Sequence, residues 1–237
     1  VAVGDNGIVL RSTDNASSFS SVSPYYTGTS RGVTFGNNTF LGVSDGGKTG
    51  RSIDNASSWN NSTSGISTTL YGVTFGNNTF VAVGQSGKIL RSTDNASSWN
   101  NSTSPITSRL YGVTFGNNTF VAVGQSGKIL RSTDNASSWD NSTSGISTNL
   151  YGVTFGNNTF VVVGPSGKIL RSTDNASSWD NSTSGISTTL KGVTFGNNTF
   201  VAVGDNGIVL RSTDNASSWN NSTSPITTDL NGVTFSE

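Results

Sequence analysis

The feature that most constrains this chain is a unit of forty residues that it repeats along its length. The segment 90–99, "LRSTDNASSW", returns with few changes, and its near-copies begin at residues 10, 50, 130, 170 and 210. A period of this length matches either a solenoid of helix pairs or the four-stranded blades of a β-propeller. The residue types within one copy must therefore decide between helices and strands.

The reference copy, residues 71–110, favours strands. No segment places apolar residues at helical spacing, and Gly or Asn interrupts the sequence at short intervals. The first hairpin turns through Gly-Asn-Asn at 76–78, residue types that tolerate a positive φ. We expect four strands in this copy, at 71–75, 79–84, 88–94 and 97–103.

The polarity of these strands indicates how the sheets pack. "FVAVG" (80–84) and "KIL" (88–90) are almost continuously apolar, which is expected of strands covered on both faces. The fourth strand is polar except for Trp99, as expected of an outer edge that avoids pairing with other chains. A sheet with two apolar faces needs a neighbouring sheet on each, so the copies form either an open stack or a ring.

The two ends of the chain favour the ring. "NGVTFSE" (231–237) supplies a first strand with no second, and "VAVGDNGIVLRSTD" (1–14) supplies a second and a third strand with no first. We expect residues 231–235 to pair beside residues 1–4 and so close the ring. The prediction is an all-β chain forming one domain over 1–237, a six-bladed β-propeller of four-stranded antiparallel blades. The predicted blades are 231–237 with 1–30, then 31–70, 71–110, 111–150, 151–190 and 191–230.

Composition excludes several classes of function. The 237 residues include 13 basic and 13 acidic side chains, so the charge does not point to nucleic acid, and no apolar run could span a bilayer. Cys and His are absent, which removes thiol and imidazole chemistry. We expect a monomer with no cofactor, no metal, no nucleic-acid partner and no membrane insertion. Richness in Ser, Thr, Asn and Gly favours an exported or cell-surface bacterial protein.

The octet "STDNASSW" at 92–99 resembles the Asp-box, or BNR repeat, Ser/Thr-x-Asp-x-Gly-x-Ser/Thr-Trp. It departs at Ala96, where the family has Gly; Phe19 replaces Trp in the first copy, and Ile53 intrudes in the second. With the preceding "VAVGQSGKIL", the repeat resembles propellers of the photosystem II assembly-factor type, and the likeness covers the whole chain. The resemblance implies the propeller fold more than an activity, because Asp-boxes occur in sialidases, lectin-like domains and receptors alike.

We interpret the octet as a clasp for its hairpin. Asp94 can accept hydrogen bonds from backbone N–H groups of the following turn, and Trp99 can fold over the hairpin. One carboxylate per turn is a poor cation site. The clasp residues are Asp14, Asp54, Asp94, Asp134, Asp174, Asp214, Trp59, Trp99, Trp139, Trp179 and Trp219.

Enzyme chemistry is not expected. A sialidase needs three arginines that converge on one carboxylate, a Tyr–Glu pair and an acid/base Asp. No Glu precedes Glu237, and the acids are scattered in turns. One arginine recurs per copy on the third strand, where we expect it to pair with a nearby acid or carbonyl: Arg11, Arg51, Arg91, Arg131, Arg171 and Arg211. We therefore predict no catalytic residue.

Differences between the copies gather at two places. One is the turn after the second strand, at 5–6, 45–46, 85–86, 125–126, 165–166 and 205–206. The other is the start of the first strand with the residue two positions earlier. In an up-and-down sheet both lie at the same end, where loops commonly bind; the alternative is that exposed loops drift after duplication. The ligand-binding candidates are Tyr71, Tyr111, Tyr151, Arg31, Lys191, Asn231, Arg109, Gln85 and Gln125.

Three hypotheses follow. The first is a non-enzymatic scaffold that binds a protein through the variable loops. The second is a multivalent glycan-binding propeller that uses repeated Tyr and Asn positions. The third is an engineered or recently amplified repeat protein with no evolved ligand, because the copies are nearly identical.

Overall fold

The computed structural model describes residues 1–235, so the last two residues of the predicted segment 231–237 lie outside the described residues. Within that range the chain forms strands and short 3-10 turns, with no α-helix. It divides into two compact units, which are described separately. Unit 1 is Val1–Leu110 with Asp134–Trp139, and unit 2 is Tyr111–Thr133 with Asp140–Glu237.

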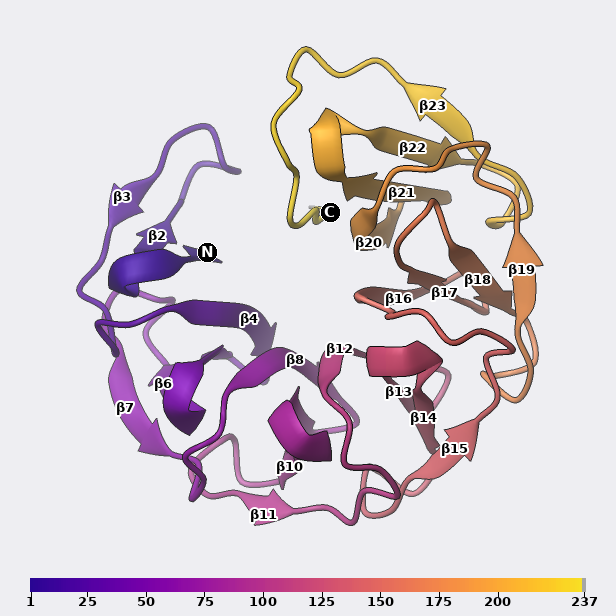
Figure 1. The fold of residues 1–237 in the computed structure, drawn as a ribbon. Coiled ribbons are helices and arrows are strands. Elements are labelled where there is room, and N and C mark those ends of the chain that lie inside the picture. The colour runs from indigo at the N-terminus through magenta and orange to yellow at the C-terminus, as the bar shows by residue number, and fades with distance from the viewer. Residues whose placement is uncertain (236–237) are drawn as a thin grey trace. The chain divides into compact units, whose positions relative to one another are not determined.

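Unit 1 contains three antiparallel sheets whose strands are joined in chain order (Figure 1). The first has three strands, β1 (Ala2–Val3), β2 (Val9–Arg11) and β3 (Ser20–Ser21). The second is β4 (Ser30–Gly36), β5 (Thr39–Ser44), β6 (Lys48–Ser52) and β7 (Asn60–Thr63). The third is β8 (Leu70–Gly76), β9 (Thr79–Gly84), β10 (Ile89–Ser92) and β11 (Asn100–Asn101).

The chain after unit 1 forms three further sheets of four strands each. The first consists of β12 (Leu110–Gly116), β13 (Thr119–Gly124), β14 (Ile129–Ser132) and β15 (Asp140–Ser142). The second consists of β16 (Gly152–Gly156), β17 (Thr159–Val163), β18 (Ile169–Ser172) and β19 (Asp180–Ser182). The third consists of β20 (Leu190–Gly196), β21 (Thr199–Gly204), β22 (Val209–Ser212) and β23 (Asn220–Ser222). Short 3-10 turns follow most of the second strands: η1 (Asp5–Gly7), η2 (Asp45–Gly47), η3 (Gln85–Gly87), η4 (Gln125–Gly127) and η5 (Asp205–Gly207). The predicted antiparallel four-stranded sheets are confirmed for five of the six copies.

The predicted burial of the second strand is also confirmed. All six residues of β9 and of β13 are buried, and so are all five of β17. The first strand adds an aromatic contact at its far end, where the rings of Phe75 and Phe80 lie 4.6 Å apart. The outer strands such as β11 and β23 stay largely exposed. Each sheet therefore buries its inner strands and leaves its fourth strand at the surface.

Two predicted strand ranges are too long. In the reference copy the third strand ends at Ser92 rather than Asp94, and the fourth is limited to Asn100–Asn101. The reason is local: the Asp94 carboxylate accepts the backbone N–H of Ser98, so those residues form a turn and pairing begins only between Arg91 and Asn100.

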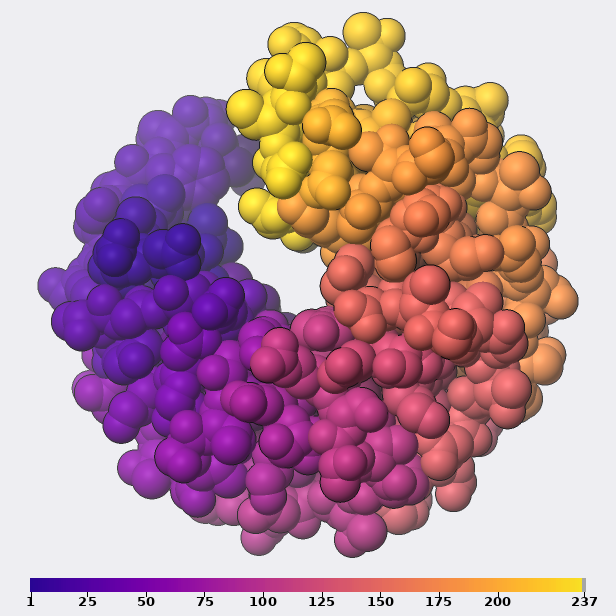
Figure 2. Space-filling model, viewed as in Figure 1, coloured from indigo at the N-terminus to yellow at the C-terminus, as the bar shows by residue number. Residues whose placement is uncertain are grey.

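The predicted closure by residues 231–235 is not confirmed. These residues form no strand, and β1 pairs only with β2 in a three-stranded sheet. Within unit 2 the segment instead lies along β20, as the yellow and orange atoms in Figure 2 show. Leu230 donates its N–H to the Gly204 carbonyl at 3.0 Å, and Phe235 covers Gly196. Residues 230–235 thus occupy the position that a first strand would have after β23, with no second strand beside them.

Candidate functional site

The variable turns and the variable starts of the first strands come together within each unit, and we call this region the variable end. In unit 1 the Gln85 N–H donates to the Thr69 carbonyl at 2.9 Å. In unit 2 the N–H of Ser126 donates to the side chain of Asn149 at 3.1 Å. A backbone N–H in η5 makes the same kind of bond to Asp229. Both variable positions of a copy therefore belong to one surface.

The turns of the variable end owe their shape to two residues in the left-handed region. In η3, Ser86 has φ 58° and Gly87 has φ 67°. A Cβ on Gly87 would collide with the Ile106 carbonyl oxygen, so this position requires glycine. Lys88 then closes the turn by donating its N–H to the Gln85 carbonyl at 3.2 Å. The backbone is thus fixed, while the first residue of the turn is free to vary.

In unit 1 the variable end carries an ion pair beside an aromatic ring. Arg31 Nε lies 2.8 Å from Asp45 Oδ1, and its guanidinium carbon is 6.0 Å from the centre of the Tyr71 ring. The hydrogen bond from Arg31 lowers the pKa of the Asp45 carboxyl, and the same bond raises the pKa of Arg31. Both side chains are partly exposed, so solvent screens the pair and its main effect is to orient the arginine.

In unit 2 the variable end has an aromatic part and a charged part. The rings of Tyr111 and Tyr151 meet edge to face with centres 5.5 Å apart. Lys191 Nζ lies 2.6 Å from Asp205 and 2.9 Å from Asp229. The hydrogen bonds to Asp205 and then Asp229 raise the pKa of the Lys191 ammonium. The aromatic pair is therefore the most apolar element of this surface.

The structure shows two contacts among the candidates, each within one unit. Arg31 and Tyr71 are neighbours in unit 1, and Tyr111 and Tyr151 are neighbours in unit 2. Lys191 is paired with Asp205 and Asp229. The other candidates lie in the variable turns or beside the starts of the first strands: Arg109, Gln85, Gln125 and Asn231.

Sequence reasoning missed the acidic partners Asp45, Asp205 and Asp229 as site residues. A signal for Asp45 and Asp205 exists in the copies: a cation at the start of the first strand accompanies Asp in the following turn, whereas tyrosine accompanies Gln or Pro. Charge at one variable position is thus matched by charge at the other. Comparison of the two positions within each copy would have revealed these pairs.

The hydrogen bonds expected of Asp94 in the clasp interpretation are present. The Asp94 carboxylate accepts the N–H of Ser98 at 3.0 Å and the hydroxyl of Ser92 at 2.7 Å, while its second oxygen accepts the Ser98 hydroxyl. These bonds, the one from the Ser98 hydroxyl first, lower the pKa of Asp94 to about 2. We call residues 92–99 and their equivalents the aspartate turns. Their carboxylates are occupied by the turn itself.

The recurring arginines hold the aspartate turn of the next copy. Arg51 Nε donates to the Asn95 carbonyl at 2.8 Å, and Arg171 makes the same bond to Asn215. Ser62 Oγ donates to the Ala96 carbonyl at 3.0 Å and adds a second link between the same two sheets. The expectation that these arginines pair with a carbonyl is confirmed for Arg11, Arg51, Arg91, Arg131 and Arg171, whereas Arg211 makes no such bond within the described residues. They are bound one per sheet and do not converge.

Within residues 1–235, no group of three or more acidic side chains could hold a metal ion. Nor does that range contain a helix long and apolar enough to cross a membrane.

Comparison with known proteins identifies the fold. No protein-family model matches the chain, and no curated protein matches its sequence. The solved structure of YCF48 bound to a D1 peptide aligns with a TM-score of 0.73 at 17% identity, over 92% of this chain and 75% of that one. YCF48 from Cyanidioschyzon merolae aligns with a TM-score of 0.72 at 16% identity, over 93% and 79%. The chain has the fold of a six-bladed β-propeller, each sheet being a blade.

Propeller enzymes share the fold over less of their own length. The GH74 enzyme of Niastella koreensis aligns with a TM-score of 0.66 at 19% identity, over 92% of this chain but 36% of the enzyme. The chain thus spans about a third of that enzyme. At this identity the likeness establishes the fold alone.

Proposed function

We propose that the chain is a non-enzymatic scaffold that binds an extended peptide of a partner protein at its variable end. The observation that carries the proposal is the Tyr111–Tyr151 pair, two partly buried rings 5.5 Å apart on the surface where the copies differ. Tyrosine offers a large apolar face and a polar hydroxyl with few rotatable bonds, which suits it to protein contacts. A propeller of the same fold is bound to a peptide in the YCF48 structure, which supports the proposal.

Each unit also offers a charged group to such a peptide. In unit 1, Arg31 beside Tyr71 presents a cation next to a ring, which suits an acidic peptide side chain. In unit 2, Asp229 is a half-exposed carboxylate, which suits a basic one. The non-enzymatic part of the proposal rests on the commitment of the recurring Arg and Asp side chains to structural bonds.

The test begins with a library of displayed random peptides, selected on the unaltered chain. Replacing Tyr71, Tyr111 and Tyr151 together by Ser should weaken the selected peptides by at least about tenfold, because buried tyrosine contacts dominate such interfaces. Affinity would be measured by calorimetry, and folding by the melting temperature.

The matched control is Ile53→Thr. Ile53 is 61% exposed in an aspartate turn, and the other copies carry Thr there, so this change should alter neither binding nor folding. Selected peptides that bind the folded triple variant as well as the parent would show that the tyrosines are not the site. A selection that yields no binding peptide would favour a repeat protein with no evolved ligand.

A further inference from the structure

Grooves recur on the blades, outside the aromatic and charged clusters described above. Each is lined by the end of a 3-10 turn or its equivalent, the lysine at or just before the start of the third strand, and the fourth strand with the loop after it. In unit 2 the largest has a volume of about 780 Å3 and another about 450 Å3, and in unit 1 one has about 410 Å3. We call them the outer grooves. They are equivalent positions of the repeat, so a ligand for one suits the others.

The linings of the two outer grooves in unit 2 share one chemistry, whereas Pro24, Tyr25 and Tyr26 add rings to the groove in unit 1. The largest outer groove is lined by Ser126, Gly127, Lys128, residues 141–148 and Lys168, which together offer hydroxyl, amide and ammonium groups. No Asp or Glu lines any of the three grooves. The only aliphatic side chain of the largest is Ile146, which packs against the hydrophobic core. The two grooves in unit 2 are therefore lined mainly by polar residue types, with lysine as their only charged side chain.

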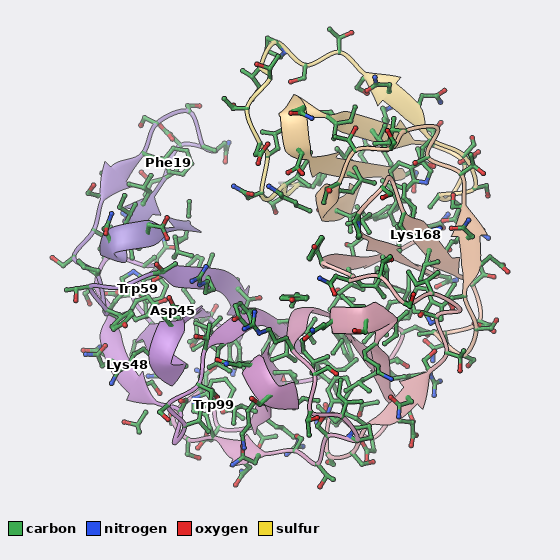
Figure 3. All side chains as sticks on the ribbon, in the orientation of Figure 1. Phe19, Asp45, Lys48, Trp59, Trp99 and Lys168 are labelled. Atoms are coloured by element: carbon green, nitrogen blue, oxygen red, sulfur yellow. The ribbon has the colours of Figure 1, made fainter. Side chains whose placement is uncertain are left out.

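Lys128 and Lys168 have no acidic partner among the described residues. Lys128 is exposed and forms no ion pair within the described residues. Lys168 lines both outer grooves of unit 2 and donates to Asn181 Oδ1 at 3.2 Å (Lys168 and Lys48 are labelled in Figure 3). A lysine that lies in a groove and has no acidic partner within the protein can bind an anion from solution.

The lysine is not required by the fold. It occupies the same repeat position in four consecutive copies, as Lys48, Lys88, Lys128 and Lys168, whereas the first and last copies have Ile8 and Ile208. Ile8 is 51% exposed, so a large apolar side chain at this position is tolerated at the surface. The charge thus distinguishes the inner copies without contributing to their cores.

From these observations we infer that the outer grooves bind acidic sugars, one carboxylated sugar unit to each lysine. Hydroxyl and amide groups both donate and accept hydrogen bonds, which matches a ligand covered with hydroxyls. The ammonium group pairs with the sugar carboxylate. An acidic peptide fits the two grooves of unit 2 less well, because each offers only one aliphatic side chain, Ile146 or Ile186, to the apolar parts of a peptide. Several weak sites spaced along one molecule would act together on a polymeric ligand.

This inference is independent of the proposed peptide site, since the outer grooves contain none of the three tyrosines tested there. The probe is tetragalacturonate, titrated by calorimetry into the full chain at low and at physiological salt. We expect more than one equivalent bound per chain, with affinity falling as salt rises. Neutral galactotetraose and a tetra-aspartate peptide serve as comparisons and should bind at least about tenfold more weakly.

Matched variants follow from the copies themselves. Replacing Lys48, Lys88, Lys128 and Lys168 together by Ile should weaken tetragalacturonate binding by at least about tenfold at an unchanged melting temperature. Ile208→Lys should add binding capacity at a copy that lacks the cation. Peptides selected for the variable end should bind the lysine variant as they bind the parent.

Three results would overturn the inference: no binding of tetragalacturonate, equal binding by the folded lysine variant, or equal binding of tetra-aspartate. Equal binding of tetra-aspartate would show that the grooves bind negatively charged ligands of any kind. Failure of the tyrosine experiment alone would not contradict sugar binding in the outer grooves. Failure of the tetragalacturonate experiment alone would not contradict peptide binding at the variable end.

Discussion

Ala96 adopts a backbone conformation that favours glycine, with φ at 60°. The same is true of its equivalents Ala16, Ala56, Ala136, Ala176 and Ala216. For a residue with a Cβ this region costs roughly 1–2 kcal/mol. In five copies the methyl group is fully buried, and that burial offsets part of the strain. Ala16 is exposed and has no such compensation.

We therefore expect Ala16→Gly to stabilise the chain by up to about 1 kcal/mol, since relief of strain exceeds the added flexibility of the unfolded chain. The measurement is denaturant unfolding. Ala96→Gly is the matched control and should gain less, because it removes a buried methyl group worth about 0.8 kcal/mol. A loss of stability in Ala16→Gly would show that the exposed turn is not strained.

Contacts between residues close in the sequence could be predicted from it, whereas contacts between residues far apart in the sequence could not. The bonds of Asp94 lie within four residues of it, so turn chemistry alone predicted them. The burial of Tyr25 was not predictable in the same way. Its ring lies against Gly42 and Gly50, and its hydroxyl is 3.0 Å from Ser44 Oγ. At the positions of Gly42 and Gly50 the other copies carry larger side chains. The Tyr25 ring of the first copy thus fills the space that the two glycines of the second copy leave.

At the scale of elements, the aspartate turns should make stability depend on acid. The folded-state pKa is about 2 for Asp14, Asp94, Asp174 and Asp214, and it is lowered further for Asp54. An unfolded aspartate titrates near 3.9. A folded pKa below the unfolded one gives stability that is full above about pH 4 and is lost as the pH falls towards 2.

Melting temperatures measured from pH 7 down to pH 2 should therefore stay level to about pH 4 and then fall. In Asp94→Asn one contributing carboxylate is absent, so the fall should be shallower and the melting temperature at pH 7 lower. An unchanged profile in that variant would contradict the clasp role of the carboxylate.

The extents of the elements were predictable only in part. The hairpin between the first two strands was predicted from Gly-Asn-Asn, and Asn77 and Asn78 indeed have positive φ. The third and fourth strands were predicted too long, because a side-chain carboxylate accepts N–H groups that a sheet would otherwise use. For the site, the alternating strand directions predicted that the two variable positions lie at the same end of a sheet. The ion pairs and the outer grooves could not be predicted from the sequence, because they depend on how side chains of separate strands and loops meet.

At the scale of the whole molecule, the pairing of residues 231–235 with residues 1–4 stays a prediction. β1 pairs with one neighbour only, and Arg211 is the one recurring arginine without a carbonyl partner in the described residues. Ending the chain after Leu230 should lower the melting temperature by at least about 5 °C, or ~2 kcal/mol for a chain of this size. Ending it after Phe235 is the control and should change little.

A second variant separates pairing from simple packing against β20. Val73 pairs with Ala82 in the reference copy, and the same register places Val233 beside Ala2. Since the chain has no cysteine, Ala2→Cys with Val233→Cys tests that register alone. An intramolecular disulfide that raises the melting temperature supports closure. Free thiols after mild oxidation would show that the two segments do not pair.

Five of the six recurring arginines bond to the carbonyl 44 residues further along, and this order has a consequence for synthesis. The acceptor always comes later in the chain than the donor, so a copy leaving the ribosome can be locked only when the next turn has been translated. Folding would then proceed from the N-terminus, each newly made segment securing the one before it. The order of translation and the order of assembly would coincide, which limits the mispairing that nearly identical copies would otherwise invite.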